Sequence, residues 1–316
     1  MQKSHNITSI IVDRVSKSYG SIKAVSNASI KIDEGCLFGL IGPDGAGKTT
    51  LFRMITTLLL CDEGNITVFG YDTLKDYKRI RQFIGYMPGR FSLYPDLTVK
   101  ENLGFYATIF GTSIEQNYHL IKPVYSLIEP FRDRLAKDLS GGMKQKLALS
   151  CALIHNPRIL VLDEPTTGVD AVSRKEFWDN LRSLKESGMT ILVSTPYMDE
   201  AAMCDKIALM QVGVIMEYDQ PGSILARYDK ILFEIRLPER FDLLNKLRSL
   251  PEVKSAYLFG ESIHVTMQSN GINRGSFTGI LQNMGFTDVQ VRSIQPDIED
   301  CFIEAVDKQK VSQVKI

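Results

Sequence analysis

Short hydrophobic runs and helical repeats alternate along the first two thirds of the chain. Short, mainly apolar runs, which are typical of buried strands, occupy residues 36–41, 84–88, 159–162 and 189–195. Residues 51–58 and 172–184 instead repeat apolar side chains at the spacing of a helix. Residues 8–34 alternate in a strand-like way about a turn at Tyr19-Gly20. Strands that alternate with helices predict an α/β fold with a parallel sheet.

Two segments depart from this alternation. From about residue 98 to 154 the spacing is helical, which predicts a helical subdomain inserted into the sheet. Pro221-Gly222 and the polar stretch to Lys230 indicate a domain boundary. The pattern that follows has the order βαββαβ and ends in a short closing helix. This order predicts a small α+β domain of the ferredoxin-like type.

Length and composition agree with two domains, which we place at residues 1–226 and 229–307, with a tail at 308–316. The chain has 316 residues, of which 44% are hydrophobic, so it can bury a sizeable core. Lys+Arg and Asp+Glu number 37 each, and zero net charge predicts no general attraction to nucleic acid. Five scattered cysteines predict reduced thiols, as in a cytoplasmic protein. No apolar run reaches about 18 residues, so a membrane channel would come from another chain.

The clearest chemical signal is a glycine-rich loop between a predicted strand and a predicted helix. Gly42, Gly47, Lys48 and Thr49 lie at the offsets of a phosphate-binding loop. Glycines let backbone N–H groups approach phosphate oxygens, and the helix directs its positive dipole end at them. Lys48 adds a cation for the outer phosphates, and Thr49 offers a hydroxyl to magnesium. The candidate nucleotide-binding residues of the loop are Gly42, Pro43, Asp44, Gly45, Ala46, Gly47, Lys48, Thr49 and Thr50.

Three other features each have more than one interpretation when taken alone. Asp163 and Glu164 end a buried strand, where Asp163 could hold a magnesium-bound water and Glu164 could accept a proton from an attacking water. The plainer alternative is a polar strand end. Ser140 and the two glycines after it are best interpreted, when taken alone, as a capped helix start. The alternative interpretation is a binding site for an anion. Tyr19 is either a turn aromatic or a side chain that stacks on an adenine ring.

In their order along the chain, these elements resemble the ATP-binding subunit of ABC (ATP-binding cassette) transporters over about residues 8–225. The loop at residues 42–50 resembles the Walker A loop. Leu162-Asp163-Glu164 resembles Walker B with its catalytic glutamate. Leu139-Ser140-Gly141-Gly142-Met143 resembles the signature motif, and Gly168-Val169-Asp170 resembles the D-loop.

The resemblance implies a role for each residue at these positions. Glu164 and Lys48 would be catalytic, Thr49 and Asp163 would hold magnesium, and Tyr19 would stack on adenine. In that family two subunits pair head to tail, and the signature of one closes over the ATP of the other. The residues implied to contact a partner's ATP are Ser140, Gly141, Gly142 and Met143, and Asp170 would lie in the D-loop.

The same resemblance implies the ligands, partners and location of the chain. ATP and magnesium are the expected ligands, and no nucleic acid is expected. The expected partners are a membrane-spanning permease subunit and a second cassette, identical or different. The chain would lie in the cytoplasm, peripheral on the inner face of the cell membrane.

Two positions depart from the family's pattern. Gly89 follows Met-Pro where the family usually has glutamine, and Pro196 follows Ser-Thr where it usually has histidine. Neither residue has a side chain that can donate or accept a hydrogen bond. Arg90, beside Gly89, is a candidate substitute that could reach the phosphates. We therefore expect the chain to bind ATP well and to hydrolyse it slowly at its own Walker A loop.

The leading interpretation is an ATPase subunit that couples ATP binding and hydrolysis at a dimer interface to export through a separate membrane subunit. Phe91, Leu93 and Tyr94 either pack a loop or help to form the docking surface for that subunit. One alternative is a non-hydrolytic structural or regulatory half of a heterodimer, which the two departures favour and Glu164 opposes. Another is a soluble cassette protein of translation or DNA repair. Such proteins usually have two cassettes in one chain or long charged inserts, and this chain has neither.

Overall fold

The computed structural model describes residues 7–90, 92–236, 240–269, 271–286 and 288–314. The chain forms two compact units. The smaller unit is Gly222–Glu304, and the larger unit combines Met1–Pro221 with Ala305–Ile316. The predicted domain bounds remain a prediction.

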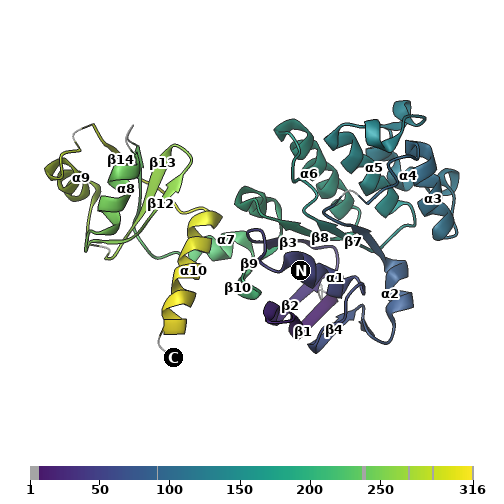
Figure 1. The fold of residues 1–316 in the computed structure, drawn as a ribbon, viewed down its shortest axis with the longest axis horizontal. Coiled ribbons are helices and arrows are strands. Elements are labelled where there is room, and N and C mark those ends of the chain that lie inside the picture. The colour runs from purple at the N-terminus through teal and green to yellow at the C-terminus, as the bar shows by residue number, and fades with distance from the viewer. Residues whose placement is uncertain (1–6, 91, 237–239, 270, 287, 315–316) are drawn as a thin grey trace, which may run out of the picture. The chain divides into compact units, whose positions relative to one another are not determined.

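A six-stranded sheet forms the centre of the larger unit (Figure 1). Its strands are β3 (Leu37–Ile41), β6 (Ile84–Met87), β7 (Ile159–Asp163), β8 (Thr190–Thr195), β9 (Lys206–Gln211) and β10 (Val214–Asp219). In space they lie in the order β10-β9-β3-β8-β7-β6, and all pairs are parallel except β9 with β10. Every residue of β3, β7 and β8 is buried. The parallel α/β core predicted from the short apolar runs is therefore confirmed.

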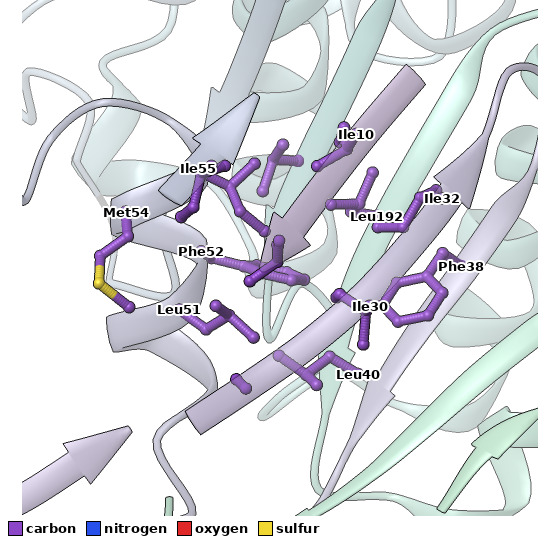
Figure 2. Close-up of a cluster of buried hydrophobic side chains, with 14 of the residues drawn as sticks. Ile10, Ile30, Ile32, Phe38, Leu40, Leu51, Phe52, Met54, Ile55 and Leu192 are labelled. Atoms are coloured by element: carbon purple, nitrogen blue, oxygen red, sulfur yellow. The ribbon is translucent and has the colours of Figure 1, made fainter. Parts of the chain in front are cut away.

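A second, antiparallel sheet completes the core of this unit. It contains β1 (Thr8–Tyr19), β2 (Ile22–Asp33), β4 (Glu63–Val68) and β5 (Tyr71–Asp72), in the order β2-β1-β4-β5. Helix α1 (Lys48–Ile55) shares one buried cluster with both sheets, and Figure 2 shows its Phe52 directed away from the helix into this cluster. Full burial of each such side chain contributes roughly 1.5–3 kcal/mol.

One predicted strand has different bounds from those expected. The sequence pattern predicts a strand at residues 66–70, whereas β4 begins at Glu63 and ends at Val68. Phe69 has φ 49° and Gly70 has φ 78°, both in the left-handed region, so these two residues turn the chain instead of extending it.

The predicted helical insertion follows β6 and lies at one end of the unit (Figure 1). It consists of α3 (Val99–Ile109), α4 (Ile114–Tyr125) and α5 (Gly141–Leu153), with short 3₁₀ turns at Glu129–Phe131 and Ala136–Asp138. Thr98 and Glu101 form a capping box at the start of α3, and Ser113 and Gln116 form another at α4. These reciprocal bonds satisfy N–H groups that a helix start leaves free. The larger unit also contains α2 (Tyr77–Phe83), α6 (Ala171–Glu186), a 3₁₀ turn at Met198–Met203 and the part of α10 (Ile298–Val314) from Ala305 onwards. Helix α7 (Pro221–Ala226) begins at the division between the units.

The smaller unit has the strand and helix order βαββαβ. Its elements are β11 (Leu232–Arg236), α8 (Arg240–Arg248), β12 (Val253–Phe259), β13 (Ser262–Met267), α9 (Arg274–Asn283) and β14 (Gln290–Ser293), and α10 (Ile298–Val314) follows. The strands form an antiparallel sheet in the order β12-β13-β11-β14. An apolar cluster that includes Phe233, Val265 and Phe277 forms its core. The predicted strand residue Leu237 lies outside the described residues, and the side chain of Phe241 is likewise not described.

A histidine joins the sheet of the smaller unit to the start of α10. His264 Nδ1 lies 2.9 Å from Asp300 Oδ1, and the imidazole stacks on Phe259 with 3.9 Å between ring centroids. Burial of the ring acts to lower its pKa. The hydrogen bond to Asp300 and the negative charges of Asp300, Asp297 and Glu234 outweigh burial, so the pKa of His264 is raised.

We expect the smaller unit to lose stability as pH rises through this raised pKa. The folded state favours the protonated imidazole. The stability that protonated His264 contributes is therefore fully present below the unfolded-state pKa of about 6.5, and it is lost as the pH rises above the folded-state pKa. The loss should be on the order of 1 kcal/mol. Urea unfolding followed by circular dichroism at a series of pH values would measure it. His264→Gln cannot titrate and should flatten the dependence, and an unchanged slope in that variant would contradict the assignment.

Candidate functional site

The carboxyl ends of neighbouring parallel strands bring the predicted site residues together. Along β3 and β8, Ile41 lies opposite Thr195, and along β8 and β7, Ser194 lies opposite Asp163. Gly42 continues from β3, and its N–H donates to Thr195 O at 3.2 Å. This edge is where open α/β sheets bind their ligands.

The loop after β3 contains two positions that only glycine can occupy. A Cβ at Gly42 would lie 2.1 Å from Met210 O, and a Cβ at Gly47 would lie 2.2 Å from Ala24 O. Gly47 also has φ 105°, in the left-handed region. Because α1 begins at Lys48, its first N–H groups lie at this loop, as anion binding at a helix start requires.

Lys48 is buried at the centre of the site. Its Nζ donates to Gly42 O at 2.7 Å and to Pro43 O at 3.0 Å, and it lies 3.1 Å from Glu164 Oε1. The lysine side chain is 2% exposed and that of Glu164 is 23% exposed. The ammonium therefore joins the loop to the end of β7 and places a cation between them.

Thr49 and Asp163 form an oxygen pair next to this lysine. Thr49 Oγ1 donates to Asp163 Oδ1 at 3.1 Å, and the whole Asp163 residue is only 3% exposed. Magnesium takes oxygen ligands, usually one or two from the protein and the rest from water or phosphate. Across the described residues, no group of three or more His, Cys, Asp or Glu side chains could hold a metal ion. The Thr49 hydroxyl and the Asp163 carboxylate are oxygen ligands of the kind that magnesium takes, so this pair fits the ion.

A hollow of about 310 Å³ lies over the glycine loop. Its walls include Lys48, Thr49 and Glu164, together with Tyr19 and Ile22 from the β1–β2 hairpin. The other lining residues are Lys23, Ala24, Gly45, Ala46, Gly47, Thr50 and Val212. Tyr19 keeps 48% of its surface exposed, so its ring is open to a flat ligand. Three predicted loop residues, Gly42, Pro43 and Asp44, are not among the described residues of this lining.

A second cleft of about 180 Å³ also has Glu164 in its wall. Gly89 and Arg90 line it after β6, and Gly141 and Gln145 line it from α5. Gln145 is absent from the predicted site residues. Its spacing of four from Gly141, on a helix that begins there, could have indicated that both lie on one face.

The two predicted helix starts are capped as their residue types require. Ser140 Oγ accepts a bond from Met143 N at 3.3 Å, at the start of α5. Asp170 Oδ1 accepts bonds from Ser173 N at 2.9 Å and Val172 N at 3.1 Å, at the start of α6. Hydrogen bonds from Ser173 above all lower the pKa of Asp170. Neither cap belongs to the described lining of the hollow over the loop.

Gly89 lies against the backbone of the predicted Walker B segment. Because Met87 of β6 pairs with Leu162 of β7, the chain leaving β6 runs past the next residue of β7. A Cβ at Gly89 would lie 2.9 Å from Asp163 O, closer than real Cβ atoms come to backbone. The structure therefore has a packing reason for glycine at this position.

Pro196 follows the last residue of β8, and the described lining residues of the hollow and of the second cleft include no histidine. His155 is occupied elsewhere, with Nε2 3.1 Å from Ile84 O and its ring stacked on Phe110. His264 belongs to the smaller unit. Arg90 lines the second cleft and not the hollow that contains Lys48, at least among the described lining residues.

Two buried side chains at this edge were not predicted as site residues. Ser194 bonds both Asp163 and Glu164 N. Glu200, which is 1% exposed, accepts bonds from Thr166 Oγ1 at 2.8 Å and Trp178 Nε1 at 2.9 Å. Trp178 is a buried packing residue of α6, and its indole N–H bond to Glu200 also ties this helix to the turn after β8. No spacing rule marks either side chain in the sequence.

Comparisons with known proteins identify the family of the chain. The family model for ABC transporters matches residues 25–167. The chain is 38% identical over 286 residues to the probable multidrug ABC transporter ATP-binding protein YbhF of Escherichia coli (strain K12), covering 89% of this chain and 49% of that protein. The chain thus spans about half the length of this relative. It is 40% identical over 214 residues to the Nod factor export ATP-binding protein I of Burkholderia lata, covering 67% of this chain and 70% of the relative.

Solved structures give the same result. The ATP-binding cassette MJ0796, in a dimeric post-hydrolysis state bound to ADP and Pi, matches with a TM-score of 0.61 and 27% identity, over 67% of this chain and 98% of its own. None of the helices in the described part of this chain is long and apolar enough to cross a membrane. The sequence relatives, the shared fold and the strand-end site together show that the chain belongs to the ABC transporter family, as an ATP-binding cassette.

Proposed function

We propose that this chain is the ATP-binding subunit of an ABC exporter, which couples ATP binding and hydrolysis to export through a separate membrane subunit. The observation that carries the proposal is the meeting of Lys48, Thr49, Asp163 and Glu164 at one sheet edge, beneath a hollow that Tyr19 also lines. The relatives named for multidrug and Nod factor export favour export as the direction.

Each side chain of the site has a distinct task in this proposal. Backbone N–H groups of the loop after Pro43 and of the start of α1 would hold the phosphates, and Lys48 would bind the outer ones. Tyr19 would stack on the adenine ring. Thr49 and Asp163 would hold magnesium, which neutralises phosphate charge when bound. Glu164 would accept the proton of the attacking water.

Lys48→Ala tests the proposal by removing the buried cation. We expect affinity for MgATP to fall by about 10- to 100-fold, because a charge-assisted bond is worth about 1.5–3 kcal/mol. Isothermal titration calorimetry would measure it. Lys137→Ala is a matched control, since Lys137 forms an exposed pair with Asp96 at 3.0 Å. Failure of the wild-type chain to bind MgATP, or an unchanged affinity in Lys48→Ala, would refute the proposal.

We further propose that the chain pairs head to tail with a second cassette. Ser140, Gly141, Gly142 and Met143 would contact the ATP of that partner, and Asp170 would lie at the same interface. The capped start of α5 lies outside the described lining of this chain's own hollow, which supports a role towards another chain. A partner with a complete site is the natural choice, because two identical chains would both lack the usual glutamine and histidine.

The membrane subunit would dock on an apolar groove of about 340 Å³ in the larger unit. Its lining includes Leu93, Tyr106, Ile109 and Phe110, beside the helical insertion. Leu93 is buried and so packs the loop as well, whereas Tyr94 is 47% exposed beside Phe105. The third predicted docking residue, Phe91, lies outside the described residues. Docking here would hold the chain at the inner face of the cell membrane.

The strongest competing proposal is a cassette that binds ATP as a structural or regulatory partner without hydrolysing it. Pro196 and the packing of Gly89 against Asp163 favour it, because both positions lack a polar side chain. Glu164 opposes it, since this carboxylate lines both the hollow over the loop and the second cleft and could accept a proton there. The two proposals differ in what happens when Glu164 alone is changed.

A further inference from the structure

One buried hydroxyl joins three groups that the proposed function needs in fixed places. Ser194, on β8, has no exposed surface. Its Oγ donates to Asp163 Oδ1 at 2.6 Å and accepts a bond from Glu164 N at 3.0 Å. The same Oδ1 accepts the bond from Thr49 Oγ1 at 3.1 Å. A continuous chain of hydrogen bonds therefore runs from α1 through β7 to β8.

The direction of each bond at Ser194 follows from its chemistry. A serine hydroxyl has one proton to donate and lone pairs to accept. Because the N–H of Glu164 can only donate, the proton of Ser194 is directed to the carboxylate of Asp163. A bond from a hydroxyl to a carboxylate is charge-assisted, and 2.6 Å is within the short range expected for it. Ser194 thus fixes which way one oxygen of Asp163 faces.

The same serine holds Glu164 in an unusual backbone conformation. Glu164 has φ 50°, in the left-handed region that residues other than glycine rarely adopt. Such conformations persist where the surroundings hold them, often at functional sites. Here the N–H of Glu164 is shared between Ser194 O at 3.1 Å and Ser194 Oγ at 3.0 Å. The carbonyl oxygen and the hydroxyl of Ser194 therefore fix the backbone of Glu164, and with it the position from which the glutamate side chain extends.

We propose that Ser194 is a positioning residue, which holds Asp163 in place for magnesium and Glu164 in place for the attacking water. This inference rests on the proposed function and deepens it. Pro196 lies two residues further along the same segment, so the segment that lacks the family's usual histidine still organises the site through Ser194. Thr190, at the other end of β8, is equally buried, and its Oγ1 accepts one bond from Gly35 N at 3.0 Å.

Removal of the Ser194 hydroxyl should leave the fold intact. In Ser194→Ala the N–H of Glu164 keeps its bond to the carbonyl oxygen of residue 194, and Asp163 Oδ1 keeps Thr49 as a donor. No buried donor is therefore left without a partner, which is the costly case. Thermal unfolding would check this. Ser194→Cys, which keeps a weak donor of similar shape, carries the test should the alanine variant fail to fold.

The experiment compares the affinity of the full chain for ATP with magnesium and for ATP with a chelator. Changes to groups that orient metal ligands typically weaken metal affinity by about 10- to 100-fold. Magnesium should increase the ATP affinity of the wild-type chain, and we expect this increase to be about 10- to 100-fold smaller in Ser194→Ala. With the chelator present, Ser194→Ala should bind ATP as tightly as the wild type does. Ser194→Cys should fall between the two. Thr190→Val, which also removes a buried hydroxyl of β8, should keep the full gain.

Two results would overturn the inference while leaving the proposed function standing. One is a magnesium-dependent gain in Ser194→Ala equal to that of the wild type. The other is an equal loss of affinity with and without magnesium, which a general structural defect would give. A wild-type chain that binds no ATP under either condition would instead refute the proposed function itself.

Discussion

Glu164→Gln is expected to lower the rate at which this site cleaves ATP by about 10²- to 10⁴-fold, the usual contribution of a positioned general base. Affinity for MgATP should change little. The glutamine oxygen can still accept a bond from Lys48, which keeps Gly42 O and Pro43 O as further partners. The amide, unlike the carboxylate, cannot take a proton from water. Single-turnover cleavage of ATP by the chain in its assembled transporter, with its partner's site blocked, would measure the effect.

Glu34→Gln provides the matched control for this change. Glu34 forms an ion pair with Arg158 at 2.6 Å at a partly exposed position, and it lines neither the hollow nor the second cleft among the described residues. Its conversion to glutamine should leave cleavage unchanged. A rate in Glu164→Gln equal to that of the wild type would show that Glu164 is not the base. It would also favour the non-hydrolytic alternative, particularly if transport were unaffected.

The larger part of this site could be predicted from the sequence because its signals are local. The glycine spacing from Gly42 to Gly47 can be recognised within one loop, although the backbone oxygens that exclude a Cβ there belong to Met210 of β9 and Ala24 of β2. The apolar runs reflect strands that are buried on both faces. Parallel strands then place their carboxyl ends at one edge, so Lys48, Thr49 and Asp163 meet as expected.

The contacts that sequence reasoning missed depend on register between strands. Ser194 reaches Asp163 because β7 and β8 pair Asp163 with Ser194, and no pattern within β8 reveals that pairing. Likewise, the approach of Gly89 to Asp163 depends on how β6 pairs with β7. The sequence shows only that Gly89 replaces the family's usual glutamine. The structure shows that position 89 has no room for a side chain.

Pro196→His is expected to raise the rate of ATP cleavage at this site by about 10²- to 10³-fold, the usual worth of one positioned donor at a transition state. Pro196 is only partly buried and directly follows β8, so an imidazole there would begin beside the edge that holds Asp163 and Glu164. Steady-state release of phosphate would measure the gain. Pro196→Ala is the matched control, because it restores the backbone N–H without the imidazole. Equal rates in both variants would contradict the prediction.

The missing glutamine should not be restorable in the same way. A Cβ at position 89 would lie 2.9 Å from Asp163 O, so any side chain there must displace the strand end that holds the predicted magnesium ligand. Gly89→Gln should therefore give no gain in turnover, and Gly89→Ala should already weaken magnesium-dependent ATP affinity. Addition of Gly89→Gln to Pro196→His should reduce the gain from histidine, because residues of one site act as a unit. A double variant faster than Pro196→His alone would show that the chain after β6 can move away from Asp163, and that glycine at position 89 is not required by packing.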